Sequence, residues 1–261
     1  MAAASKPRGK SVRAAAARLS LAEVMSALAA AGSEQTRRTY ARHGVTQPMF
    51  GVSFATLKTL YKRIKLDHEL ALALWETGNF DARNLAVKVV DPARMAQLDL
   101  DRWATDLSAR SCGNYVAQVA AEGPHAWDCV TRWLCAELES QRTIGWKLVA
   151  RLALLDEHAD DAWFAAQLGA IEREIHTTSN AVREAMNEAV IAIGCRNPAL
   201  REAATGAARR IGKVEVDHGD TACKTPDAIS SIDKAWAHAQ AKSVSSPAAQ
   251  ERARESLRTR C

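Results

Sequence analysis

Aromatic residues make up only 5% of this 261-residue chain, and it holds few glycines and prolines, 13 and 7 respectively. Runs of Val, Ile, Thr and Tyr at period two, which are typical of half-buried strands, are missing, whereas Ala and Leu are abundant. We therefore expect an all-α fold, with a substantial core in one domain and two flexible ends. Five of the seven tryptophans stand within apolar patterns and are expected in that core: Trp75, Trp103, Trp133, Trp146 and Trp163.

Two further absences exclude classes of site. The six cysteines form no C-x-x-C pair, which argues against a zinc ribbon or a disulfide framework and favours free thiols in a reducing cytoplasm. His218 and Cys223 would need partners from elsewhere to bind a metal, so we expect neither a metal nor a cofactor. No apolar run reaches about 18 residues, so we expect no membrane-spanning segment and a cytoplasmic protein.

The formal net charge is +5, but the excess comes from the start of the chain. Residues 1–18 carry five basic side chains and no acid, and the remaining 30 basic residues balance 30 acids. The charge total is thus no sign of nucleic-acid binding unless charges gather on one face. We predict a flexible basic arm (1–18), a helical domain (19–241) and a flexible C-terminal tail (242–261), because the tail lacks an apolar face.

Helix boundary signals recur at short intervals. Ser20, Ser53 and Asp67 stand where N-caps are expected, and Gly44 and Gly78 stand where the chain leaves helices. The segments between them repeat apolar residues at helical spacing, so each helix has a wide apolar face for a neighbour. Stacked antiparallel helix pairs follow.

Three of the predicted helix pairs have related openings, near residues 81, 141 and 180. The last interval has about the length of a HEAT repeat, and the first leaves room for another pair between 98 and 122. We therefore predict an α-solenoid, an alpha-alpha superhelix of HEAT-like repeats. Such stacking would align Arg83, Arg142 and Arg183 along one surface fit for a polyanion, although each arginine alone is equally compatible with a solvated helix face.

Several longer stretches are more specific. The chain carries "GVSFATLKTLYKRI" before "DHELALALW", then "TGNFDAR", "VVDPARM", "DRWATDL", "IGWKLVARLAL" and "IAIGCRNPALR". In these, over roughly residues 40–225, it resembles the bacterial DNA alkylation repair family. The resemblance implies a HEAT-like solenoid related to alkylpurine DNA glycosylases. Active members excise cationic N3- or N7-alkylated purines, and a carboxylate with flanking tryptophans stabilises the positive charge that develops on the deoxyribose.

The family's site follows "DRWATDL" with a pattern close to Trp-Asp-x-x-Asp. Here the resemblance places Arg110 at the Trp, Ser111 at the first Asp and Asn114 at the catalytic carboxylate. Asn keeps the shape but carries no charge to oppose a cation, so we expect no catalytic residue at this position. The second Trp falls near Glu188, and either Glu188 or Asp106 is a candidate substitute carboxylate.

Our leading hypothesis is a monomeric DNA-binding member of the family that holds double-stranded DNA in a basic concave groove, with a degenerate or weak glycosylase site. One alternative is an active alkylpurine glycosylase with a substitute carboxylate, and another is a protein-binding helical scaffold. The family's phosphate-contacting arginine matches Arg142, with Thr143 as the competing register. The predicted nucleic-acid-binding residues are Arg83, Arg110, Asn114, Arg142, Lys147 and Arg183.

Overall fold

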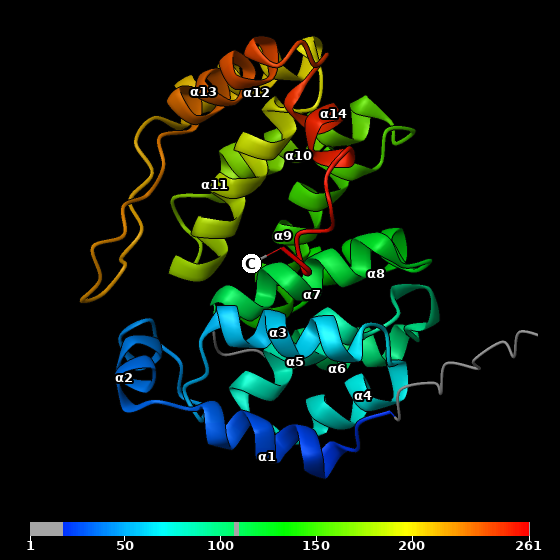
Figure 1. The fold of residues 1–261 in the computed structure, drawn as a ribbon. Coiled ribbons are helices and arrows are strands. Elements are labelled where there is room, and N and C mark those ends of the chain that lie inside the picture. Colours follow the sequence, from blue (N-terminus) through cyan, green and yellow to red (C-terminus); the bar gives the residue numbers. More distant parts are fainter. Residues whose placement is uncertain (1–17, 107–109, 261) are drawn as a thin grey trace, which may run out of the picture.

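The computed structural model describes residues 18–106 and 110–260, without the side chains of residues 110 and 111. Every regular element in these ranges is a helix (Figure 1), which confirms the all-α prediction. None of the described helices is long and apolar enough to cross a membrane. The helices are α1 (Leu21–Ala31), α2 (Glu34–Arg42), α3 (Phe54–Ile64), α4 (His68–Glu76), α5 (Phe80–Val89), η1 (Pro92–Arg94), α6 (Gln97–Thr105), α7 (Arg110–Glu122), α8 (Ala126–Leu134), α9 (Glu139–Leu155), α10 (Asp161–Glu174), α11 (Asn180–Gly194), α12 (Pro198–Ile211), α13 (Ala228–Ala241) and α14 (Pro247–Arg252).

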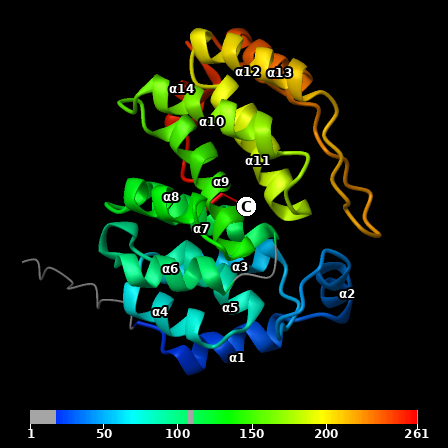
Figure 2. The same ribbon diagram turned by 180° about the vertical axis from the view of Figure 1, so that it is seen from behind.

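The helices from α4 to α13 form two stacked layers (Figures 1 and 2). The inner layer contains α5, α7, α9, α11 and α13, and each of these packs against the next one. Their partners α4, α6, α8, α10 and α12 form the outer layer, and α6 with α7 is the extra pair expected between 98 and 122. This is the predicted α-solenoid. Because the layers alternate along the chain, the inner helices run in one direction, so their N-terminal ends gather at one edge and their C-terminal ends at the other.

The predicted helix boundaries follow from local chemistry. The Ser20 hydroxyl accepts from Glu23 N, and the Glu23 carboxylate accepts from Ser20 N, which is a complete capping box. Ser53 and Asp67 cap α3 and α4 in the same way, each accepting from a backbone N–H three residues on. At the opposite helix ends Gly44 has a φ of 80°, a conformation in which a side chain is strained.

One buried carboxylate explains why the segments around residues 50 and 80 are so characteristic. Asp81 Oδ2 accepts from Phe50 N (2.6 Å) and Gly51 N (3.0 Å), and its Oδ1 accepts from Val52 N (2.8 Å). Gly51 has a φ of 81°, and a Cβ there would lie 2.5 Å from Ser33 O. The first turn of α5 therefore fixes the loop that leads into α3, and with it the position of α2 beside the solenoid.

The prediction that five tryptophans lie in the core is mostly confirmed. Trp75, Trp103, Trp133 and Trp146 are buried, and the rings of Trp75 and Trp103 stack at a centroid distance of 4.2 Å. Trp163 is half-buried and packs against the core. Buried aromatic surface of this size contributes strongly to the stability of the solenoid.

The segment predicted as a flexible C-terminal tail packs on the solenoid in the structure, and the predicted basic arm lies, up to residue 17, outside the described residues. Residues Pro247–Arg252 form α14, which packs on α9 and α13. Arg258 is only 7% exposed, because its guanidinium donates to the carbonyl oxygens of Val87, Lys88 and Val90 at the end of α5. Charge-assisted hydrogen bonds to helix ends, rather than an apolar face, hold this segment in place.

Candidate nucleic-acid interface

A cleft of about 900 Å³ opens on the inner layer of the solenoid. Its floor is formed by residues of successive inner helices: Phe80 of α5, Asn114 of α7, Lys147 of α9 and Ala181 of α11. One wall is α2 with the turn after it, and the opposite wall is the long segment between α12 and α13, which we call the 212–227 loop. Figures 1 and 2 show α2 and the 212–227 loop projecting on the same side of the solenoid, one from each half.

Both walls carry exposed basic groups. Arg42 and His43 stand at the end of α2, and Lys224 stands in the 212–227 loop. All three are exposed, and none forms an ion pair with another residue in the described part of the chain. Since surface charges without a local partner are available for an external anion, Arg42 and Lys224 offer one cation on each wall, in a cleft that Asp217 and Glu184 also line.

The floor of the cleft holds a neutral cluster of three side chains. Lys147 Nζ donates to Asn114 Oδ1 (2.8 Å) and to Glu188 Oε2 (3.0 Å). The Lys147 side chain is only 5% exposed, whereas that of Glu188 is 37% exposed. The ammonium and the carboxylate cancel, so the position predicted for a catalytic anion carries no net charge. The structure thus brings together two predicted binding residues, Asn114 and Lys147, with the candidate carboxylate Glu188.

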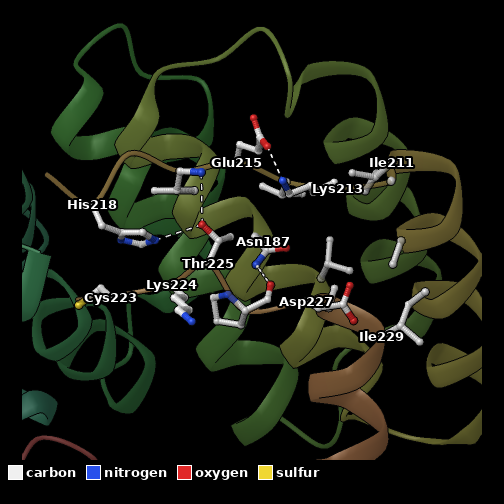
Figure 3. A pocket seen from close by; sticks show the side chains of 17 residues that line it. Asn187, Ile211, Lys213, Glu215, His218, Cys223, Lys224, Thr225, Asp227 and Ile229 are labelled. Atoms are coloured by element: carbon white, nitrogen blue, oxygen red, sulfur yellow. Dashed lines mark hydrogen bonds and ion pairs between the residues drawn. The ribbon is translucent and has the colours of Figure 1, made fainter. Parts of the chain in front are cut away.

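The 212–227 loop is fixed by three side chains from one face of α11. The Asn180 side chain exchanges two hydrogen bonds with the backbone of Asp217 (2.7 and 2.8 Å). Arg183 Nη1 donates to Glu215 O. Asn187 Nδ2 donates to Pro226 O, as Figure 3 shows. The loop and α11 enclose a second cavity of about 600 Å³ at the base of the loop. The hydrogen bonds from α11 therefore fix the 212–227 loop in place as one wall of the cleft.

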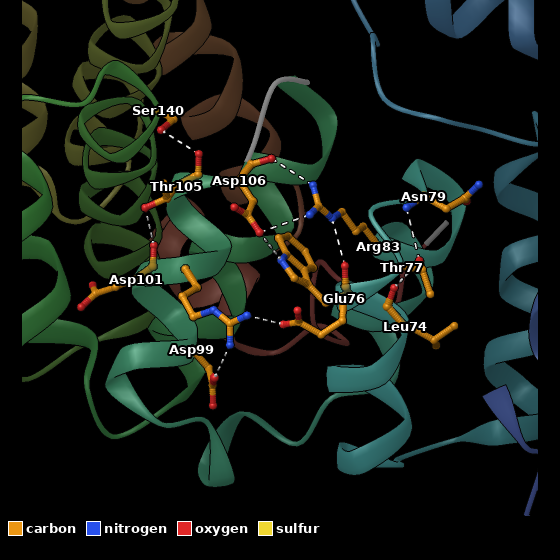
Figure 4. A network of polar contacts seen from close by, with 12 residues as sticks. Leu74, Glu76, Thr77, Asn79, Arg83, Asp99, Asp101, Thr105, Asp106 and Ser140 are labelled. Carbon is orange, nitrogen blue, oxygen red and sulfur yellow. Dashed lines mark hydrogen bonds and ion pairs between the residues drawn. The ribbon is translucent and has the colours of Figure 1, made fainter.

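Two of the repeated arginines, Arg83 and Arg183, bond backbone groups within the solenoid. Arg83 Nε donates to Trp75 O (3.2 Å), and its guanidinium also bonds the carbonyl and carboxylate of Asp106 (Figure 4). Arg183 Nε donates to Ile175 O (3.0 Å), again eight residues earlier, at the end of an outer helix. In both helix pairs, the arginine of the inner helix donates to carbonyl groups of the turn that precedes it. Both guanidinium groups are bonded within the solenoid, and DNA contact by Arg83 and Arg183 stays a prediction.

Of the remaining predicted residues whose side chains are described, Arg142 and Asp106 do not line the cleft. Arg142 opens α9, is 32% exposed and sits 3.4 Å from Glu174, but it does not line the cleft. Arg110 begins α7, and its side chain lies outside the described part of the structure. Asp106, the other candidate carboxylate, is held by Arg83 and by Trp75 Nε1 (3.3 Å). It is therefore part of a structural network at the end of α6.

The thiol next to the cluster does not add a nucleophile. Cys112 is buried in α7, and burial raises the pKa of its thiol to about 12. It therefore stays protonated at neutral pH and behaves as a small apolar side chain. Among the other described cysteines, Cys129 and Cys195 are also buried, whereas Cys135 and Cys223 are exposed.

Sequence reasoning missed Arg42, His43 and Lys224, which are the exposed basic groups of the cleft. Arg42 and His43 belong to no repeat and to no motif of the resemblance, and Lys224 lies in "KVEVDHGDTACKTPDA", which resembles one branch of the family but does not single out this lysine. The only local signal was their place beside glycines and turn residues, where a chain leaves a helix. Their relation becomes visible only when α2 and the 212–227 loop, about 180 residues apart in sequence, face each other across the inner layer.

Comparisons with known proteins agree with this architecture. The family described as "DNA alkylation repair enzyme" matches residues 24–232. Uncharacterised proteins of Listeria innocua and Listeria monocytogenes are each 29% identical over 217 residues, which cover 80% of this chain and 93% of the relative.

A solved structure is also similar, with a TM-score of 0.76 and 28% identity over 87% of this chain and 96% of that one. It is described as representing a new family of proteins related to the HEAT-like repeat DNA glycosylases with affinity for branched DNA structures. The HEAT-like fold and the resemblance deduced from the sequence are thereby confirmed. This chain belongs to the DNA alkylation repair family.

Proposed function

We propose that this protein binds branched DNA, with a duplex arm in the cleft between α2 and the 212–227 loop, and that it does not excise bases. The observation that carries the proposal is the combination of exposed, unpaired basic groups on both walls with a charge-neutral floor. Arg42 and Lys224 are available to contact phosphates from either wall, and the floor lacks the anion that excision of a cationic purine requires.

Helix ends add to the electrostatic attraction. Phe80, Asn114 and Ala181 belong to the first two turns of α5, α7 and α11, so the positive ends of three helix dipoles are directed at the same side of the inner layer. Phosphate groups are stabilised at such N-terminal ends, where backbone N–H groups lack helical partners. Arg142 remains a predicted phosphate contact at the start of α9.

The form of the DNA is proposed from the similar solved structure, whose family has affinity for branched DNA structures. The cleft of this chain suits such a ligand, because two separate walls stand on either side of one floor. One arm can lie between them while the other arms leave past α2 and the 212–227 loop. The expected contacts are to phosphates, so binding should depend steeply on salt and little on base sequence.

The absence of excision is proposed on charge. In the glycosylase mechanism implied by the family, a fixed carboxylate opposes the cation that forms as the base leaves. Here Asn114 is uncharged, and the nearby Glu188 is neutralised by Lys147. A carboxylate already paired with an ammonium 3.0 Å away stabilises a second cation poorly. Asp106 is in turn paired with Arg83.

Binding and release measured on the same protein test the proposal. A fluorescent four-way junction is titrated in an anisotropy assay, and methylated duplex is incubated with excess protein while free 7-methylguanine and 3-methyladenine are quantified. We expect salt-dependent binding of the junction and no base above the spontaneous rate. Release of either base, abolished by Glu188→Gln, would establish the glycosylase alternative instead.

A further inference from the structure

The C-terminal tail caps the C-terminal ends of the inner helices. Its backbone and side chains donate to carbonyl oxygens that have no partner within their own helix. A guanidinium at such an end is further favoured by the helix dipole. The contacts are Ala248 N to Cys195 O (3.1 Å) beyond α11, Arg252 Nη1 to Leu154 O (3.3 Å) in α9, and Arg258 to Val87 O, Lys88 O and Val90 O (3.2, 2.9 and 3.1 Å) at α5.

The arginines of the tail form ion pairs with glutamates of the same chain. Arg258 Nε bonds Glu122 of α7 at 2.8 Å, and Arg252 lies 3.4 Å from Glu157. Arg254 and Arg260 both pair with Glu251, at 3.8 and 2.5 Å. The positive charge of this segment therefore fixes it to the solenoid, and little of it faces a ligand.

The tail also removes positive charge from the inner layer. Glu251 lies 3.5 Å from Arg151, which stands one turn after Lys147 on α9, and the two side chains are only 14% and 12% exposed. A cavity of about 430 Å³ separates the tail from the Asn114–Lys147–Glu188 cluster. Because that cluster lines both this cavity and the cleft, the tail stands directly behind the floor of the cleft.

Resting on the proposed function, we infer that the tail is a specificity element, a fixed wall that closes the C-terminal edge of the inner layer to DNA. The layer is then open only between α2 and the 212–227 loop. An arm or an end of DNA enters there and stops at the cluster, whereas an uninterrupted duplex laid across the inner helices would collide with residues 246–260. The region shared with the family ends at residue 232, before this wall begins.

Two full-length variants with the same change of charge test the wall. Arg258→Glu places a carboxylate against Glu122 and the carbonyl end of α5, so it should release the tail. Arg254→Glu is the matched control, because Arg254 is 45% exposed and has one weak ion pair. Circular dichroism checks folding, and limited proteolysis of the tail checks its release.

We expect Arg258→Glu to bind an uninterrupted duplex about tenfold more tightly than Arg254→Glu, with a salt slope larger by about one because Arg151 is freed. Affinity for a four-way junction should differ less than twofold between the two variants. If the two variants bind the duplex equally well and still bind the junction, the tail does not exclude a duplex, and the proposed function stands. If the unaltered protein binds no DNA of any form, both proposals fall.

A second measurement applies even if Arg258→Glu does not fold. A photoreactive benzoylphenylalanine replaces Ala181, at the cleft, or Leu257, on the tail, in otherwise unaltered full-length protein. Under illumination with a junction, the probe at position 181 should crosslink to DNA and the probe at position 257 should not. A crosslink from position 257 as strong as that from 181 would contradict the wall.

Discussion

Replacing Glu188 with Gln changes the charge of the cleft floor and leaves its shape intact. The carboxylate partners Lys147 at 3.0 Å, and the Lys147 side chain is almost fully buried, so the substitution leaves an ammonium with a single neutral acceptor, Asn114. Removing one member of a fully buried pair costs about 3 to 5 kcal/mol, whereas exposed pairs contribute about 0 to 1 kcal/mol.

More than a third of the Glu188 side chain is exposed, and Gln retains an acceptor oxygen. We therefore expect Glu188→Gln to lower the free energy of unfolding by about 1 to 2 kcal/mol. That corresponds to a decrease in Tm of about 2 to 8 °C for a chain of this size. DNA binding should change in the opposite direction, since the cleft loses one negative charge. At a contact distance of about 4 Å in water the gain is about 1 kcal/mol, or about fivefold in affinity.

The assay is a salt titration of junction binding, paired with thermal unfolding of the same samples. The control is Glu172→Gln, which makes the same change of net charge in a pair with the exposed Arg210, between the outer helices α10 and α12 and away from the cleft. It should leave the affinity unchanged. Weaker junction binding by Glu188→Gln than by this control would refute the reasoning, because Glu188 would then hold the cleft in its binding form.

Three other predictions concern stability, binding and reactivity. Asp81→Ala leaves three backbone donors without an acceptor and should lower the free energy of unfolding by about 3 kcal/mol or more in urea titrations; a change below about 1 kcal/mol would contradict the role given to this carboxylate. Asn114→Asp adds a second carboxylate beside Lys147, which already neutralises Glu188, so the cleft floor gains a net negative charge and the variant should bind a junction about fivefold more weakly in the same salt titration; unchanged or tighter binding would contradict the charge argument. Iodoacetamide at pH 8 should modify Cys135 and Cys223 in the native protein much faster than the buried thiols of Cys112, Cys129 and Cys195, as peptide mapping by mass spectrometry will show.

The pKa values of the same three buried thiols, raised by burial to about 12, 12 and 11, also set a pH dependence. The unfolded chain ionises them from about pH 9, so their contribution to stability is complete below that pH and is lost as the pH rises toward 11 or 12. Urea midpoints should therefore fall above pH 9, and they should fall less in a Cys112→Ala variant compared with its own midpoint at pH 8. An equal decrease of the urea midpoint in both proteins would contradict the contribution of the Cys112 thiol to this pH dependence.

The sequence was sufficient for those features that depend on local chemistry. Caps such as Ser20 and Ser53 satisfy N–H groups three residues away, and Gly44 adopts a backbone conformation that few other residues tolerate, so both are visible in a short window. Apolar periodicity then gave the helix pairs and the solenoid. Asn114, which was singled out through the resemblance to the family, lines the cleft.

The features that the sequence did not reveal depend on contacts between distant residues. Arg258 bonds a carbonyl 170 residues earlier in the chain, and no local pattern in the tail indicates such a partner. Lys147 and Glu188 are 41 residues apart, so their mutual neutralisation was likewise hidden. The repeated arginines correctly indicated related helix pairs. An arginine such as Arg83 can bind either a phosphate or a carbonyl, however, and the sequence alone does not distinguish the two.

The central claim is that DNA lies between the two walls of the cleft. It is tested most directly by comparing two double variants in a salt titration of junction binding. Arg42→Ala with Lys224→Ala removes one exposed charge from each wall, whereas Arg38→Ala with Lys213→Ala removes the same charges from the same two elements outside the cleft, where each is paired with a glutamate. We predict that the first pair lowers the salt slope by about two and weakens binding at least tenfold, with little change for the second. Equal effects of the two pairs would contradict the account.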